Sequence, residues 1–440
     1  MIMIRNIINY IVFIPVALLT PGVNFAGPVV GGNTAEPTTL NNTALKADQM
    51  RTSTVLQTEQ ESEETDIALM ASGRGMSAQE ATDLYNFQKN FRELAADIIE
   101  KYPNQISRIY VDPHNPQGYL DFIGDIPARV EELAGKLNIH KKIVFGKAGE
   151  MSLDDKFSRV PIISKALGNR GYKNLAVYHS MEDDAVHVDL RIPDNANIPE
   201  KAQLLGSINA SLRGSKAKEI PASKLVMNIT RGEEPLVTMH TTRGGAYTHD
   251  SGACTSGWPV YRYSTNFGND YVGYGMITAG HCTEGGLTGY IRDHVNGYDY
   301  ALENWVHYFD QNGYDLAFHR TPTSYVGNEF HADTNNIRQA LYFQYTNSMV
   351  GNGVCLFGRS SNYRSCTAYV QQVNVSVYVD GIYTNGLAVT SSTSSILGDS
   401  GGGWSSGNTA WGINTGTYGA SGGLFTPIEV AMNILGVYIP

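Results

Sequence analysis

Ser400 is the residue of this chain whose neighbours best suit covalent chemistry. It lies in the run Gly398-Asp399-Ser400-Gly401-Gly402. A serine hydroxyl is a weak nucleophile near neutral pH and needs a base that is oriented by a third group. It also needs N–H donors aimed at the oxyanion that forms on attack, and glycines allow the tight backbone that directs them there. The alternative is a glycine-rich turn with an incidental serine.

The spacing of Gly398, Ser400 and Gly402 also matches the Gly-x-Ser-x-Gly elbow of the α/β-hydrolases. That elbow requires an acid and then a histidine downstream of the serine. After Ser400 the sequence has no histidine, and its only acid is Glu429. The elbow is therefore excluded, and any base must come from upstream.

Two upstream segments supply a base and an acid to orient it. "MITAGHC" places His281 at the end of an apolar strand, and "GYDLAFHR" places Asp315 in a hydrophobic setting. A carboxylate persists there only if something pairs with it. The role that fits Asp315 is to accept the Nδ1–H of His281, which leaves Nε2 to take the serine proton.

The motifs "TAGHC", "DLAF" and "GDSGG", in this order, resemble those of the chymotrypsin superfamily of serine endopeptidases. The likeness extends to the secreted bacterial branch, the streptogrisins and α-lytic protease, and covers roughly residues 245–440. It implies an all-β catalytic domain of two six-stranded antiparallel β-barrels with the site between them. The resemblance further implies that the N–H groups of Gly398 and Ser400 form the oxyanion hole. The segment that would bind the substrate backbone contains Asn414, Thr415, Gly416 and Thr417.

The four cysteines are Cys254, Cys282, Cys355 and Cys366. An even count in an exported chain favours two disulfides, although the spacing alone leaves three pairings open. A zinc site is not favoured because there is no close Cys-x-x-Cys pair. The resemblance implies the pairs Cys254–Cys282 and Cys355–Cys366. No metal or other cofactor is predicted.

The expected specificity pocket departs from the family at two positions. Ser394 stands where relatives often have a cysteine, so one disulfide is missing. Neither Ser394 nor the two residues after it offer a carboxylate that could pair with a basic substrate side chain. Thr417 stands where relatives often have glycine, which narrows the pocket. We therefore expect an apolar or small residue before the scissile bond.

Asp399 also lacks its usual partner. Leu356 stands where bacterial relatives commonly carry an arginine that pairs with this aspartate. A buried carboxylate without a partner would be costly. The groups that remain as candidate partners of Asp399 are a new N-terminus created by cleavage, Arg359, Arg364 and Arg338.

The elements that must position these residues are strands. Residues 245–440 contain six Arg and no Lys against nine Asp and four Glu, a net charge of −7. Short alternating segments such as "YVGYGMIT" and "VNVSVYVDG", bounded by glycine and asparagine, predict an all-β domain. The acidic balance argues against binding of nucleic acid. A short terminal helix is predicted, with Thr426 as N-cap, Pro427 as first helical residue and Glu429 completing a capping box.

The preceding residues 73–244 predict an α+β domain. Residues 77–102 have a helical pattern with Ser77 as N-cap and Glu80 completing a capping box. One helical face carries Leu84, Phe87, Phe91, Leu94 and Ile98. Two successive β-β-α-β patterns follow, which suggests internal duplication. No site chemistry is predicted here, and His179 and His187 are interpreted as ordinary partly buried residues.

The first 72 residues predict export and a flexible lead-in. Residues 1–26 contain Arg5, an apolar run over residues 7–19 and Ala26, the layout of a secretory signal peptide. That run is too short to span a bilayer, and no later segment is apolar enough, so we expect a secreted, extracellular protein without a membrane partner. Residues 27–72 are poor in aromatic residues, which predicts a flexible segment whose acidic residues 59–66 are solvated.

The resemblance supplies a role for the N-terminal half. It implies a zymogen whose pro-region acts as an intramolecular chaperone and inhibitor and is removed by cleavage within residues 241–251. Polypeptide substrates and the chain's own pro-region are the expected partners, and a monomer is expected. The alternatives are a binding domain that stays attached, a catalytically inactive homologue that serves as a secreted binding protein, and an esterase as a side activity.

Overall fold

The computed structural model describes residues 55–148, 151–232, 254–262, 273–283, 289–292, 299–308, 313–321, 327–379, 382–419 and 422–439. The expected signal peptide, most of the expected lead-in and the expected cleavage segment, residues 241–251, lie outside the described residues.

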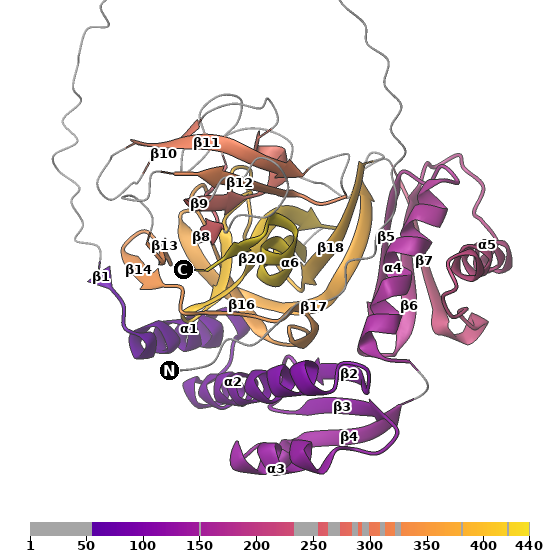
Figure 1. The fold of residues 1–440 in the computed structure, drawn as a ribbon, viewed down its shortest axis with the longest axis horizontal. Helices are drawn as coiled ribbons and strands as arrows, with labels where there is room; N and C mark the ends of the chain where they lie inside the picture. The colour runs from indigo at the N-terminus through magenta and orange to yellow at the C-terminus, as the bar shows by residue number, and fades with distance from the viewer. Residues whose placement is uncertain are drawn as a thin grey trace, which may run out of the picture. The chain divides into compact units, whose positions relative to one another are not determined.

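The N-terminal region contains the two predicted β-β-α-β units, the first as a separate three-stranded sheet and the second as three strands of a larger sheet (Figure 1). In each unit the first two strands are antiparallel and the third runs parallel to the second. The first unit consists of β2 (Ile106–Val111), β3 (Gly118–Ile123), α3 (Ala128–Lys136), η1 (His140–Lys142) and β4 (Ile143–Ala148). The second consists of β5 (Asn174–Ser180), β6 (Ala185–Ile192), α5 (Lys201–Gly214), η2 (Ala222–Lys224) and β7 (Leu225–Arg231).

Helix α2 (Ala78–Lys101) has the predicted start and the predicted buried face. The Ser77 side chain accepts a bond from the Glu80 N–H, and the Glu80 carboxylate accepts one from the Ser77 N–H, which closes the capping box. All five residues of the predicted apolar face are buried. Helix α4 (Leu153–Gly168), by contrast, was not predicted, because Pro161 lies inside it and a proline argues against a helix interior.

The interpretation of the lead-in as flexible is wrong for its last residues. β1 (Val55–Leu56) pairs with a strand of the C-terminal region, and α1 (Glu59–Arg74) follows from the N-cap Thr58. The expected solvated acidic run therefore lies in this helix, where its last member, Asp66, is buried. Glu59 and Glu61 lie in the first turn, where negative charge is favourable. Composition averaged over residues 27–72 concealed this short amphipathic segment.

The C-terminal region has the expected all-β fold of two six-stranded antiparallel sets. The first has the order β10-β11-β12-β9-β8-β22, and the second the order β16-β19-β20-β21-β18-β17, which β16–β17 pairing closes into a barrel. The first set comprises β8 (Pro259–Arg262), β9 (Gly273–Thr278), β10 (Gly289–Arg292), β11 (Asp299–Tyr308), β12 (Leu316–Arg320) and β22 (Val437–Tyr438). The second comprises β16 (Gly353–Gly358), β17 (Tyr363–Val379), β18 (Ile382–Thr390), β19 (Gly403–Ser406), β20 (Thr409–Tyr418) and β21 (Gly422–Pro427). Smaller elements are η3 (Gly280–Thr283), β13 (Glu329–His331), β14 (Asn336–Gln339), β15 (Tyr342–Phe343) and η5 (Thr346–Ser348).

The N-terminal and C-terminal regions share one sheet and one core. β17 runs past the barrel and pairs antiparallel with β5, with Ser376 opposite Val177, so that a ten-stranded sheet contains strands of both regions (Figure 1). A single buried apolar cluster contains Phe91 and Leu120 of the N-terminal region and Leu356 and Trp404 of the C-terminal region. The sequence predicted the two folds but not this joint.

The terminal helix α6 (Ile428–Leu435) is confirmed, but its predicted cap is wrong. Its N-cap is Pro427, which makes no side-chain capping bond. The Glu429 carboxylate instead accepts a bond from the Thr346 N–H at 2.8 Å. Among the helices of the described residues, none is both long and apolar enough to cross a membrane.

Candidate functional site

Two neighbouring strands of the first six-stranded set bring His281 and Asp315 together. β9 ends at Thr278 and leads into η3, which contains His281, while Asp315 directly precedes β12. The two strands are antiparallel, with Thr278 opposite Ala317, so both residues emerge at the same end. Gly280 allows the close approach, because a Cβ there would lie 2.8 Å from the Leu316 nitrogen and 3.2 Å from Asp315 Oδ1.

The Asp315 carboxylate holds the His281 ring by Nδ1. Nδ1 lies 2.9 Å from Oδ2 and 3.0 Å from Oδ1, and the His281 backbone N–H donates to Oδ1 at 2.9 Å. Both side chains are buried. Burial alone would raise the pKa of Asp315, but the charge of His281 and hydrogen bonds from His281 and Thr415 lower it below its usual value overall. The carboxylate is therefore ionised near neutral pH and selects the tautomer with the proton on Nδ1.

Ser400 lies in a loop that packs against the end of β9. Gly398 and Gly401 have φ values of 94° and 83°, in the left-handed region that favours glycine. A Cβ at Gly401 would lie 2.0 Å from Thr278 Oγ1 and 2.2 Å from the Thr255 carbonyl oxygen. Glycine at this position thus lets the serine loop approach the strand that leads to His281.

The serine hydroxyl and the expected oxyanion donors are not engaged elsewhere. Ser400 is 2 % exposed, and among the described residues its Oγ has no hydrogen-bond partner, so no bond joins it to His281. In the same part of the chain, the N–H groups of Gly398 and Ser400 donate to no other group. Nucleophile–base bonds are often long in structures without substrate, so this geometry remains compatible with proton transfer between the two residues.

Asn414 holds the serine loop from the neighbouring strand β20. Its Nδ2 donates to Ser395 Oγ at 2.8 Å and to the Asp399 carbonyl at 3.1 Å. Its backbone carbonyl accepts from the Gly401 N–H at 2.6 Å, and its N–H donates to the Gly402 carbonyl at 2.8 Å. The sequence predicted a substrate contact here, whereas the polar groups of this fully buried residue are engaged within the protein.

Thr415 has a role that the sequence reasoning missed. Its side chain helps to lower the pKa of Asp315, and its buried hydroxyl lies 3.4 Å from the Thr426 hydroxyl. The sequence signal for this role was a threonine within the segment that was expected to bind the substrate backbone. Of the other predicted pocket residues, Gly416 is buried, while Thr417 and Ser394 are partly exposed.

Asp399 is held by backbone amides. Its Oδ1 accepts from the N–H groups of Ser360 and Ser361 at 2.8 and 3.0 Å, and Oδ2 accepts from the Ile396 N–H at 3.0 Å. No cation among the described residues pairs with it, and burial raises its pKa above the usual value despite these bonds. A Cβ at Gly358 would lie 2.1 Å from Asp399 Cγ, so the close approach requires glycine there.

The three arginines that the sequence offered to Asp399 have other partners. The Arg359 guanidinium donates to Asn362 Oδ1 at 2.8 Å. Arg338 and Arg364 both bind Asp66. Leu356, which replaces the arginine of the bacterial relatives, is 1 % exposed and belongs to the core shared by the two regions. A new N-terminus produced by cleavage within residues 241–251 would lie outside the described residues.

The structure joins the cysteine pairs that the resemblance implied. Cys254 is bonded to Cys282, directly after His281, and Cys355 is bonded to Cys366. Each pair lies beside another side chain able to bind a metal, His281 in the first case and Asp66 in the second. The sulfurs are disulfides rather than thiolates, the form that binds metals.

The site and the fold together resemble one class of protein. A buried His281–Asp315 pair beside a Gly-Asp-Ser-Gly-Gly loop, on two six-stranded antiparallel sets, resembles the arrangement of the chymotrypsin-superfamily serine proteases. Among such proteases, the sequence resembles the streptogrisin branch.

The sequence is similar to Streptogrisin-C from Streptomyces griseus, with 27% identity over 296 residues. The match covers 64% of this chain and 56% of the relative, so the chain spans little more than half the length of that protein. No family model matches the chain.

Solved structures of proteases also match part of the chain. Protease A of Thermobifida fusca has a TM-score of 0.35 at 21% identity, and the match covers 45% of this chain and 96% of the protease A chain. Cellulomonas bogoriensis chymotrypsin has a TM-score of 0.34 at 23% identity, covering 46% and 98%. The α-lytic protease homologue N4 has a TM-score of 0.33 at 23% identity, covering 46% and 99%.

Proposed function

We propose that the chain is the precursor of a secreted serine endopeptidase that hydrolyses peptide bonds through an acyl-enzyme on Ser400. The observation that carries the proposal is the buried Asp315 carboxylate on Nδ1 of His281, next to the loop that holds Ser400. In this assignment His281 Nε2 takes the hydroxyl proton as Ser400 attacks the carbonyl carbon. His281 then returns that proton to the leaving amine.

The oxyanion that forms on attack needs donors that are already in place. The N–H groups of Gly398 and Ser400 suit this role because they make no other hydrogen bond in the described residues. The left-handed φ of Gly398 turns the loop at this point. Water hydrolyses the acyl-enzyme in the second half of the reaction, with His281 again as base.

On the substrate side we assign residues 415–417 of β20 to main-chain pairing with an extended peptide. β19 pairs with β20 only as far as Ile413. The same edge of residues 415–417 is therefore not covered by β19. Ser394 and Thr417 flank the expected pocket, which offers no carboxylate for a basic side chain and favours apolar or small residues before the scissile bond.

We assign residues 73–244 to a pro-region that assists folding and blocks the site until it is cleaved. Support comes from the shared ten-stranded sheet and the shared core, because both give this region a large contact with the second barrel. Barrels built from non-local strand pairs fold slowly, so a folding template has a physical rationale. The two disulfides are typical of an oxidising, extracellular compartment.

The test is to secrete the chain from a host and to follow both processing and cleavage. Mass spectrometry of the product should show loss of the N-terminal region by a cut within residues 241–251. A peptide library should be cut after apolar or small residues. An intact N-terminal region would contradict the pro-region assignment. A normally processed product that cuts no peptide would favour the inactive binding homologue.

A further inference from the structure

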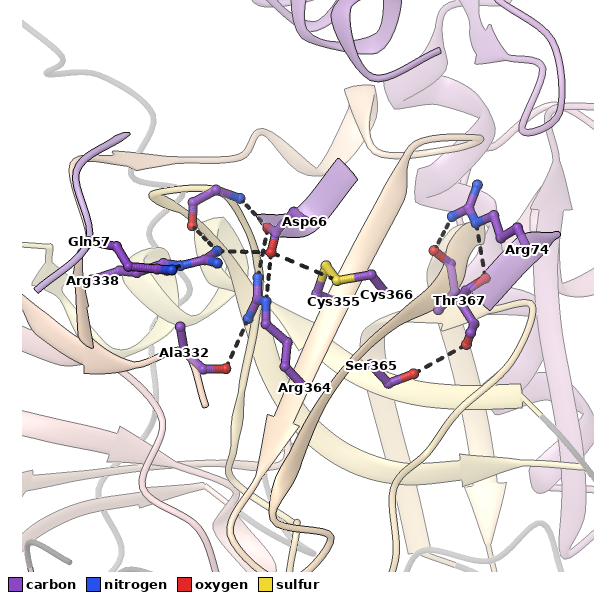
Figure 2. The surroundings of a disulfide bond; sticks show 12 residues. Gln57, Asp66, Arg74, Ala332, Arg338, Cys355, Arg364, Ser365, Cys366 and Thr367 are labelled. Atoms are coloured by element: carbon purple, nitrogen blue, oxygen red, sulfur yellow. Dashed lines mark hydrogen bonds and ion pairs between the residues drawn. A yellow bond between two sulfur atoms is a disulfide. The ribbon is translucent and has the colours of Figure 1, made fainter. Parts of the chain in front are cut away.

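A carboxylate of the N-terminal region lies buried within the C-terminal region, beside a disulfide (Figure 2). Asp66 of α1 is 2 % exposed. Its Oδ1 accepts from Arg338 Nη1 at 3.0 Å and from Arg364 Nε at 2.8 Å. Its Oδ2 accepts from Arg364 Nη2 at 2.9 Å and from the Gly407 N–H at 2.7 Å. Each oxygen thus has two donors, an arrangement that suits a planar carboxylate.

The donors come from three separate segments of the C-terminal region. Arg338 lies on β14, Arg364 on β17, and Gly407 in the turn between β19 and β20. The disulfide sulfur of Cys366 is 3.8 Å from Asp66 Oδ1. β19 begins three residues after Ser400, so the carboxylate ties β14 and β17 to the turn that ends the first strand after the serine loop.

The two arginines depend on this carboxylate for their charge balance. Their side chains are 0 % and 2 % exposed. In the described part of the chain, Asp66 is the one carboxylate that either arginine binds. Their other bonds go to neutral oxygens, Gln57 Oε1, the Gly407 carbonyl and the Ala332 carbonyl. Without Asp66, two like charges would remain buried together, which is strongly unfavourable.

The segment that carries Asp66 makes its own contacts with the C-terminal region. β1 pairs with β14, and the Arg74 guanidinium donates to the carbonyl oxygens of Thr367 and Ala368. Met70 and Ala71 cover the Cys355–Cys366 disulfide. These contacts are separate from the β5–β17 pairing, so residues 55–74 bind the barrel at a second place.

We propose that Arg338, Arg364 and the Gly407 N–H form a carboxylate-binding site of the C-terminal region, which Asp66 fills in the uncut chain. The site is open to another carboxylate whenever Asp66 is absent. The expectation that the site becomes empty after processing rests on the proposed function, but the existence of the site does not.

The experiment uses the full chain with Ser400→Ala, so that no self-cleavage occurs. Asp66→Ala is compared with Asp83→Ala, a matched control because Asp83 is exposed on α2. The midpoint of urea unfolding is measured while formate replaces chloride at constant ionic strength, with inorganic phosphate as a tetrahedral anion. We expect Asp66→Ala to raise the unfolding equilibrium constant about 100-fold or more. Formate should restore the midpoint saturably, and phosphate should not.

Several outcomes would overturn the site. These are a cost of Asp66→Ala no greater than that of Asp83→Ala, an equal effect of formate on both variants, or equal rescue by phosphate. If Asp66→Ala does not accumulate folded, the chain with Asp66→Leu, Arg338→Met and Arg364→Met is used, because it removes all three charges. We expect it to fold and to ignore formate, and its failure to fold would also overturn the site. None of these measurements uses catalysis. A finding that Ser400 is not the nucleophile would therefore refute the proposed function and leave the carboxylate-binding site untouched.

Discussion

Of the three described aspartates that are buried within the C-terminal region, Asp66 and Asp399 have opposite environments. Asp66 is held by two guanidinium groups, whose charges lower its pKa although burial opposes them. Asp399 is held by three backbone N–H groups without a cation in the described residues, and burial raises its pKa. Two of the arginines that the sequence offered to Asp399 are bound to Asp66 instead. The N-terminal region, rather than the serine loop, therefore neutralises these buried cations.

A third buried aspartate, Asp315, has the histidine itself as partner, and its substitution should have the largest effect. Asp315→Asn should lower kcat about 10⁴-fold while the fold is retained, because an amide cannot both hold the Nδ1–H and stabilise the charged ring. The kinetics of peptide cleavage by the processed protein provide the measurement. Asp333→Asn, in a turn of the same region, is the control and should leave kcat unchanged. A loss of less than about tenfold in Asp315→Asn would reject the orienting role.

The opposite pKa shifts of Asp66 and Asp399 give opposite dependences on pH. Asp66 has a folded-state pKa below its ordinary value of 3.8, so its stabilising effect is complete above about pH 4 and is lost as the pH falls through the lowered pKa. For Asp399 the folded-state pKa is raised, so its ionisation costs stability at neutral pH, and that cost is relieved as the pH falls through the raised value.

In the Ser400→Ala chain, we therefore expect the stability advantage of Asp66 over Asp66→Asn to be about 100-fold in the unfolding constant at neutral pH. It should shrink as the pH falls below about 4. Urea unfolding of both chains over a pH series measures this difference. A difference that stays constant with pH would show that the charge of Asp66 is not what the arginines require.

The Asp399 environment can be tested through Gly358. In Gly358→Ala the new methyl group would meet the Asp399 carboxyl group, so we expect a loss of about 1–3 kcal/mol in stability and about tenfold in kcat, since Ser400 follows Asp399. Gly327→Ala, in the C-terminal region with open space around the added Cβ, is the matched control and should leave both stability and kcat unchanged. Equal behaviour of the two variants would show that the carboxyl group readily moves.

The sequence predicted what depends on local pattern. The capping box of Ser77 and Glu80, the two β-β-α-β units and the alternating strands are all short-range signals. The pairing of His281 with Asp315 could be predicted because catalysis by a serine requires both partners. The roles of Asn414 and Thr415 needed the bulged register of β20, which no local pattern contains.

What the sequence could not predict depends on contacts between distant residues. Asp66 meets Arg338 and Arg364 across more than 270 positions of the chain, and the acidic run around it looked solvated. The same holds for β5 and β17, whose pairing joins two regions that were each predicted correctly. Leu356 looked like a defect at Asp399, whereas it is a core residue.

The measurement that tests the central claim most directly is kcat/KM for peptide cleavage by the processed protein with and without Ser400, the Ser400→Ala chain being cut within residues 241–251 by an added protease that is then removed. For Ser400→Ala we predict a loss of about a millionfold, because the covalent route is removed while substrate binding is kept. To exclude a folding defect, the urea midpoints of the two proteins should agree. Cleavage by Ser400→Ala at a rate near that of the parent protein would contradict the assignment of Ser400 as nucleophile.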